Sequence, residues 1–142
     1  MWRLPRRMEE IALLVYGRGR REVEVAEELG VSRQAVNKAL KEARGRLAEM
    51  FLSLAEILDA DIVKVDVKRG YAVLRLRQLG EKAYVVYVPQ KGPRILFERG
   101  VELEGGRASY QEVVEAALKW GLIREAKDLG KALRELIAMM ES

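Results

Sequence analysis

The chain of 142 residues contains no cysteine and no histidine. The absence of cysteine excludes disulfides and thiol nucleophiles, and the absence of both residue types excludes zinc-finger ligands and an imidazole base. Carboxylates alone remain as candidate metal ligands, and we find no sequence motif for a cofactor. These absences favour a binding protein without a cofactor over an enzyme.

Long apolar runs are also missing. No run approaches the roughly twenty residues that a membrane-spanning helix needs, and the basic segment 2–7 is not followed by the apolar core of a signal peptide. We therefore expect a cytoplasmic protein that does not contact a membrane. The single asparagine, Asn37, and the 34% content of charged residues are typical of heat-adapted proteins.

The positive charge is mild and unevenly distributed. The net charge is +4 and the pI is about 9.4. Residues 1–46 carry eleven basic and seven acidic side chains, a surplus of +4, and residues 59–99 carry nine and five, also +4. Residues 100–142 carry six and eight, a balance of −2. A basic surplus of this size permits nucleic-acid binding without identifying it.

Helical periodicity predicts three helices in the first 58 residues. Pro5 suits a first helical position, Gly17 ends the first helix, and Gly30 ends the second. The hydroxyl oxygen of Ser32 can accept a hydrogen bond from a free backbone N–H at the start of the third helix. The predicted helices are 5–16, 22–29 and about 33–58.

Apolar residues of the third helix recur at alternating steps of four and three, which is a heptad seam. The seam is sustained for three heptads, and we expect it to be too long for so small a domain to bury alone. It therefore predicts a two-stranded coiled coil, parallel or antiparallel, in a homodimer. The alternative is a single long helix lying on the body of its own subunit. The residues assigned to the dimer seam are Leu40, Leu47, Met50, Leu54 and Ile57.

Short β-rich runs separated by turns occupy residues 59–98 and predict an antiparallel meander of three or four strands. In the run from Tyr71 to Arg77, one alternate set of residues is apolar and the other includes two arginines, so we expect one dry and one basic face. The expected strands are 62–67, 71–77, 83–88 and 94–97.

The last forty residues predict a loop and two helices. Residues 101–108 include two adjacent glycines, Ser109 is expected to cap a helix that reaches about Trp120, and a final amphipathic helix is expected within 123–140. The predicted fold class is α+β, with an N-terminal helix-turn-helix bundle and a long third helix, then a small antiparallel β-meander and C-terminal helices. The predicted domains are 1–58, which binds DNA and dimerises, and 59–142, an accessory domain.

The segment 22–41 has the features of a helix-turn-helix. This motif needs a small residue where its helices cross, a residue that tolerates positive φ in the turn, and apolar residues on both sides. Ala26 is the small residue and Gly30 stands at the turn. The apolar residues expected to hold the two helices together are Val25, Leu29, Val31, Val36 and Leu40.

Polar side chains suited to DNA occupy the exposed positions at the start of the third helix. Arginine can bind guanine through two hydrogen bonds, glutamine and asparagine can bind adenine, and lysine can reach phosphates. The first acidic residue of this helix is Glu42, past the part expected to enter the groove. We predict base contacts by Ser32, Arg33, Gln34 and Asn37, and phosphate contacts by Lys38 and Lys41.

A basic turn precedes the second helix. Arg18, Arg20 and Arg21 lie beside Gly17 and Gly19, and the glycines allow the backbone to follow a phosphate strand closely. We predict phosphate contacts by the three arginines. The alternative is a basic turn that serves only solubility.

The run from Val25 to Lys41 resembles the helix-turn-helix of the sigma-region-4-like group, which includes archaeal Tfx-type regulators. It is also similar, more weakly, to plasmid repressors of the TrfB (KorA) type, which place a dimerising element after the DNA-binding helices. The resemblance covers about residues 8–50. It implies contacts with bases or phosphates by Arg33, Gln34, Asn37 and Lys38.

The sequence thus predicts a sequence-specific transcriptional regulator that binds double-stranded DNA as a homodimer, with its recognition helix in the major groove. One alternative is an adaptor or antitoxin-like autoregulator that binds a partner protein through residues 59–142. Another is a metal-dependent nuclease, suggested by Asp59, Asp61 and the Asp66–Lys68 triplet. Such nucleases usually need a longer stretch of sequence between the first acid and the lysine than this chain provides. A small-molecule sensor is a further alternative, for which residues 59–142 contain no ligand motif.

Overall fold

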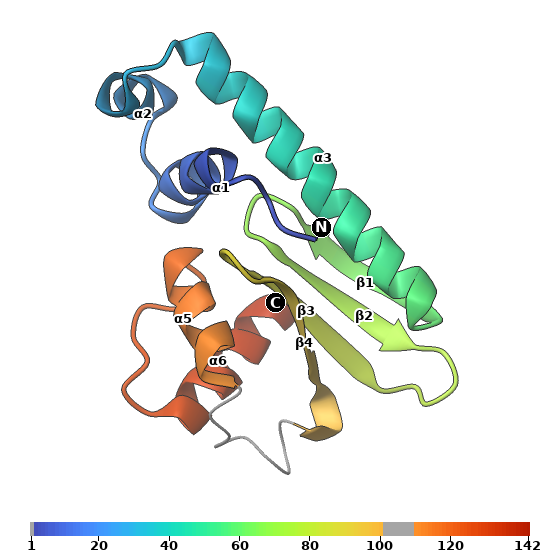
Figure 1. The fold of residues 1–142 in the computed structure, drawn as a ribbon. Coiled ribbons are helices and arrows are strands. Elements are labelled where there is room, and N and C mark those ends of the chain that lie inside the picture. Colours follow the sequence, from blue (N-terminus) through green and yellow to red (C-terminus); the bar gives the residue numbers. More distant parts are fainter. Residues whose placement is uncertain (1, 101–109) are drawn as a thin grey trace.

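The computed structural model describes residues 2–100 and 110–142, and the predicted loop 101–108 and the predicted cap Ser109 lie outside them. Helices precede and follow a single sheet, so the predicted α+β fold is confirmed (Figure 1). The helices are α1 (Arg6–Ala12), η1 (Leu13–Gly17), α2 (Glu22–Leu29), α3 (Arg33–Ile57), α5 (Gln111–Lys119) and α6 (Leu129–Glu141). The strands are β1 (Ala60–Asp66), β2 (Tyr71–Leu76), β3 (Lys82–Val88) and β4 (Gly92–Phe97).

The first predicted helix changes its winding halfway. The α-helical part ends at Ala12, and Leu13–Gly17 form a π-helix, in which the N–H of Arg18 donates to the carbonyl of Leu13 at 3.0 Å. The wider π-turn brings Gly17 against the backbone of Lys119, where a Cβ would overlap the Lys119 carbonyl. Only glycine therefore permits this close approach between the N-terminal helices and α5.

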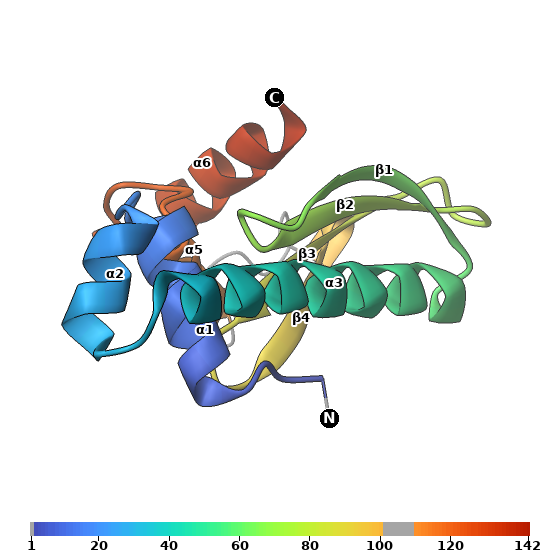
Figure 2. The ribbon, with the colours of Figure 1, turned by 90° about the horizontal axis from the view of Figure 1, so that it is seen from above.

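The four strands form an antiparallel meander in the order β1-β2-β3-β4, as the sequence predicts. Tyr71 pairs with Val86 across β2 and β3, and a bulge at Ile62/Lys64 interrupts the β1–β2 pairing. Strands β1 and β4 are the edges of the sheet. Figures 1 and 2 show α3 along one face of the sheet and α5 and α6 against the other.

The prediction that the second strand has one dry and one basic face is wrong, because both of its faces are largely buried. Tyr71 and Val73, assigned to the basic face, are 1% and 2% exposed, and only Arg75 and Arg77 of that face are exposed. The C-terminal helices cover this face of the sheet. On the same face, Arg94 of β4 donates a hydrogen bond of 2.8 Å to Glu112 of α5. A sheet between two helical layers buries both sets of alternate residues.

The predicted coiled-coil seam is also corrected. Its side chains from α3 pack on the chain's own sheet and on α1, which is the arrangement of a long helix lying on its own subunit. Four of the five side chains are already buried inside one chain, and Ile57 at the C-terminal end of α3 is the exposed one, so no continuous seam remains for a partner helix. The exposed fractions are 2% for Leu40, 1% for Leu47, 6% for Met50, 8% for Leu54 and 70% for Ile57.

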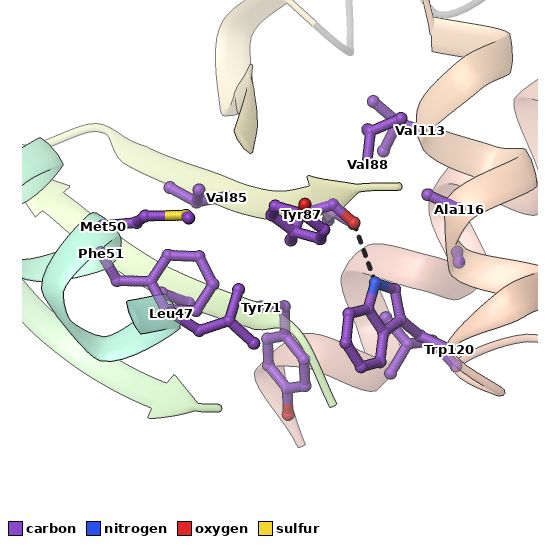
Figure 3. Close-up of a cluster of buried hydrophobic side chains, with 14 of the residues drawn as sticks. Leu47, Met50, Phe51, Tyr71, Val85, Tyr87, Val88, Val113, Ala116 and Trp120 are labelled. Atoms are coloured by element: carbon purple, nitrogen blue, oxygen red, sulfur yellow. Dashed lines mark hydrogen bonds between the residues drawn. The ribbon is translucent and has the colours of Figure 1, made fainter. Parts of the chain in front are cut away.

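One continuous core joins the residues on both sides of the predicted domain boundary at 58/59. Trp120 is completely buried in this core, with its indole N–H donating to the Tyr87 carbonyl at 2.8 Å and its ring edge-on to Tyr87 (Figure 3). Gly70 adopts φ +68° directly beneath the Trp120 ring, where a Cβ would collide with it. Figure 3 places Leu47 and Phe51 of α3 in the same cluster.

A buried carboxylate ties α1 to the end of β3. Glu9 is 3% exposed and accepts hydrogen bonds from the Tyr87 hydroxyl at 2.6 Å and from the Gln90 N–H at 2.8 Å. The Gln90 side chain donates a further hydrogen bond to it. A buried carboxylate must have such donors, so this network fixes the helical unit against the sheet.

Candidate nucleic-acid interface

The turn between α2 and α3 has the geometry that a helix-turn-helix requires. Gly30 ends α2 in the left-handed conformation with φ 68° and ψ 33°. The N–H of Val31 donates to the Ala26 carbonyl at 3.0 Å, which closes the turn. Ala26 is 6% exposed, as expected for a small residue at a helix crossing. The predicted helix-turn-helix is therefore present in the fold.

Apolar side chains hold the two helices in place. Val25 and Val36 are completely buried, Leu40 is 2% exposed, and Leu29 and Val31 are half-buried against the same core. All five predicted residues therefore pack on the inner side of the motif. Their burial fixes which side of α3 faces outward.

Ser32 is the N-cap of α3. Its hydroxyl oxygen accepts a hydrogen bond from the Ala35 N–H at 3.0 Å, so the predicted capping role is confirmed. The residue is exposed, and its hydroxyl proton remains able to donate to a phosphate or a base. The cap also brings the positive end of the α3 dipole to the protein surface, where it favours an anion.

The outer side of the first α3 turns is polar and open. Five exposed residues line a shallow hollow of about 490 Å³ there, and they span eight helical steps, or about 12 Å. Within residues 2–100 and 110–142, the three cations among them form no ion pair. Their charges face solvent. The five residues, here called the recognition face, are Arg33, Gln34, Asn37, Lys38 and Lys41.

Asn37 of this face is bound to the preceding helix. Its amide nitrogen Nδ2 donates to the Glu22 carboxylate oxygen Oε1 at 3.2 Å. Glu22 is the first residue of α2 and is half-buried. Sequence reasoning did not single out Glu22, because helical periodicity relates residues within one helix and these two lie fifteen positions apart on different helices.

The basic turn before α2 is partly neutralised by that helix. Arg20 pairs with Glu28 at 2.7 Å, and Arg21 pairs with Glu24 at 3.2 Å. Hydrogen bonds from the Arg21 backbone N–H and then from its guanidinium hold the pKa of Glu24 below its ordinary value. Arg18 is exposed and, in the part of the chain that the structure describes, forms no ion pair. It is the strongest candidate of the three for a phosphate contact.

A second groove lies on another side of α3, between that helix and the N-terminal segment. It has a volume of about 340 Å³. Sequence analysis did not anticipate it, because it forms only where the first residues fold back along the helix. Its lining comprises Trp2, Arg3, Arg46, Glu49, Met50 and Ser53.

The acids that suggested a nuclease do not form a cluster. Asp59 and Asp61 each bind Arg77 at 2.9 Å, and Asp66 accepts the Arg69 N–H at 3.1 Å at the far end of β1. An extended strand of this length separates the two groups by roughly 17 Å. Among the described residues, no group of three or more acids is placed to hold a metal ion.

Comparison of the chain with protein-family models, with curated proteins and with solved structures gives no match. Among the described residues, no helix is both long and apolar enough to cross a membrane.

Proposed function

We propose that this protein is a sequence-specific regulator of transcription that binds double-stranded DNA through α3. The observation that carries the proposal is the recognition face at the exposed, positive end of a long helix, held outward by the packing of α2. Arg33, Gln34 and Asn37 supply the donors and acceptors that pair with base edges in the major groove. Lys38 and Lys41 supply charge for the phosphates on either side.

We further propose that the protein binds DNA as a homodimer. One recognition helix contacts only a few base pairs, and dimeric helix-turn-helix proteins bind two half-sites roughly 34 Å apart. The proposed homodimer cannot use the buried residues of α3. Strand β1 offers exposed apolar side chains at the sheet edge, with Ile62 41%, Val63 51% and Val65 38% exposed, and Ile57 is 70% exposed at the end of α3. We place the subunit contact on this side of the molecule.

Selection of binding sites from random duplexes tests the proposal. We expect enrichment of an inverted repeat, and light scattering should give the mass of a dimer. Enrichment of no sequence would leave a non-specific DNA binder. Failure to bind any duplex at low salt would refute DNA binding altogether.

A second candidate function also fits the exposed edge of β1. The apolar residues of that strand suit a partner protein as well as a second copy, since edge strands with exposed apolar side chains are sites of association. An adaptor or antitoxin-like autoregulator would copurify with a stoichiometric partner. Recovery of the chain without a partner and as a dimer would favour the homodimeric regulator.

A further inference from the structure

We infer that Glu22 is a specificity-determining residue that positions the Asn37 side chain to recognise adenine. The inference depends on the proposed DNA-binding function and deepens it. The hydrogen bond of 3.2 Å between Asn37 Nδ2 and Glu22 Oε1 joins the first residue of α2 to the middle of the recognition face. Glu22 does not itself need to touch DNA in this role.

The hydrogen bond fixes which way the amide of Asn37 is oriented. A carboxylate can only accept hydrogen bonds, so the nitrogen of the amide must point toward Glu22 and the oxygen away from it. An asparagine without such a neighbour can turn its amide over and exchange the positions of donor and acceptor. Glu22 removes that ambiguity before DNA arrives.

The orientation leaves Asn37 with the groups that adenine requires. The amide nitrogen carries two hydrogens, and one of them is donated to Glu22. The carbonyl oxygen and the second hydrogen stay free. Together they can accept from the N6 amino group of adenine and donate to its N7, which is the two-bond contact that asparagine makes in the major groove. Because the side chain is already oriented, less conformational entropy is lost on binding.

The position of Glu22 supports this role. Glu22 is the first residue of α2, and its carboxylate reaches α3 through the hydrogen bond with Asn37. Glu24 and Glu28 of the same helix are paired with arginines of the basic turn. Glu22, in contrast, accepts its hydrogen bond from Asn37 of the recognition face.

Three variants separate positioning from charge. Glu22→Ala removes the acceptor and should reduce the preference for adenine over the other bases at one position of each half-site by roughly fivefold or more. Glu22→Gln keeps an oxygen acceptor without the charge, but its amide can also donate to the Asn37 oxygen, so it should lose part of the preference and less than Glu22→Ala loses. Glu27→Ala is the matched control, because it removes an exposed acid from the same helix without contacting Asn37. Loss of a negative charge near phosphates should raise affinity for all duplexes in all three variants.

The experiment measures relative affinities for the selected site and for its single-base variants, in the wild type, the three variants and Asn37→Ala. Asn37→Ala should lose the same adenine preference, and adding Glu22→Ala to it should change the preference no further. An unchanged adenine preference in Glu22→Ala, or a loss in Glu27→Ala of equal size, would overturn the inference. Thermal denaturation shows whether each variant is folded. If the wild type selects no site, the proposed function fails rather than the role of Glu22.

Discussion

The hydroxyl of Tyr87 donates a hydrogen bond to the buried carboxylate of Glu9 at 2.6 Å and accepts one from the Leu4 N–H at 2.7 Å. Tyr87 belongs to β3, and its two partners belong to α1 and the segment before it. This hydroxyl therefore helps to connect α1 and the segment before it to the sheet.

Replacement of Tyr87 by Phe should destabilise the fold by about 1–3 kcal/mol, because the Leu4 N–H and the Glu9 carboxylate each lose a partner inside the protein. Urea denaturation measures the loss. Tyr16→Phe is the control, since its hydroxyl accepts a hydrogen bond from Arg44 at a part-buried site and should cost less. Equal stability of Tyr87→Phe and the wild type would contradict this account of the connection.

Alkaline pH should weaken the fold through the same tyrosine. Burial, followed by the hydrogen bond to Glu9, raises the pKa of Tyr87 above its ordinary value, and burial with the bond to Glu141 raises the pKa of Tyr84. The folded chain thus holds these protons more tightly than the unfolded chain. The stabilisation is complete below about pH 10 and is lost as pH rises further, by up to about 1.4 kcal/mol per pH unit for each tyrosine.

Denaturation experiments between about pH 9 and about pH 11 would show this decline. Tyr87→Phe should have a shallower decline than the wild type, although its stability at neutral pH is lower. A free energy of unfolding that stays constant over this range in the wild type would contradict the predicted linkage.

The burial of the α3 seam leads to a prediction about stability. Leu47→Ala should cost about 2–5 kcal/mol, because it leaves a cavity beneath the sheet. Leu52→Ala, on the exposed side of the same helix, should change stability by no more than about 0.5 kcal/mol because the side chain is 54% exposed. Chemical denaturation measures both. If Leu47→Ala instead gave a folded monomer of unchanged stability, Leu47 would belong to a dimer interface, as the coiled-coil prediction holds.

The helix-turn-helix could be predicted from the sequence because its determinants are local. Gly30, Ser32 and the neighbouring apolar residues fix the turn, the cap and the packing within about twenty residues of chain. The bounds of α2 and α3 follow from those positions. The order of the strands follows for the same reason, since short turns join neighbours of a meander.

The segments that bury the apolar side of α3 and the faces of the sheet could not be predicted in this way. The heptad pattern shows that one side of α3 is buried, but it does not show whether a second copy or the chain's own sheet buries it. Similarly, Val73 is buried by helices that follow in the chain only after residue 110. Contacts between distant segments also account for the bond of Glu9 to Tyr87 and that of Glu22 to Asn37.

The basic turn should show different salt dependence at its different arginines. Arg18→Ala should lower the slope of log affinity against log salt by about 0.9, as for the loss of one phosphate contact. Arg20→Ala should lower this slope by less, because Arg20 is already paired with Glu28 at 2.7 Å. Titration at several salt concentrations measures both effects. An unchanged slope in both variants would assign the turn to solubility alone.

Comparison of the recognition face on a selected duplex and on scrambled DNA tests the central claim most directly. Arg33→Ala should lose roughly 1–3 kcal/mol on the selected site and much less on scrambled DNA, because a base contact is lost. Lys38→Ala should weaken binding to both duplexes alike, because a phosphate contact is lost. Neither residue is buried, so both variants should stay folded. Equal losses on the two duplexes for Arg33→Ala would contradict sequence-specific recognition by α3.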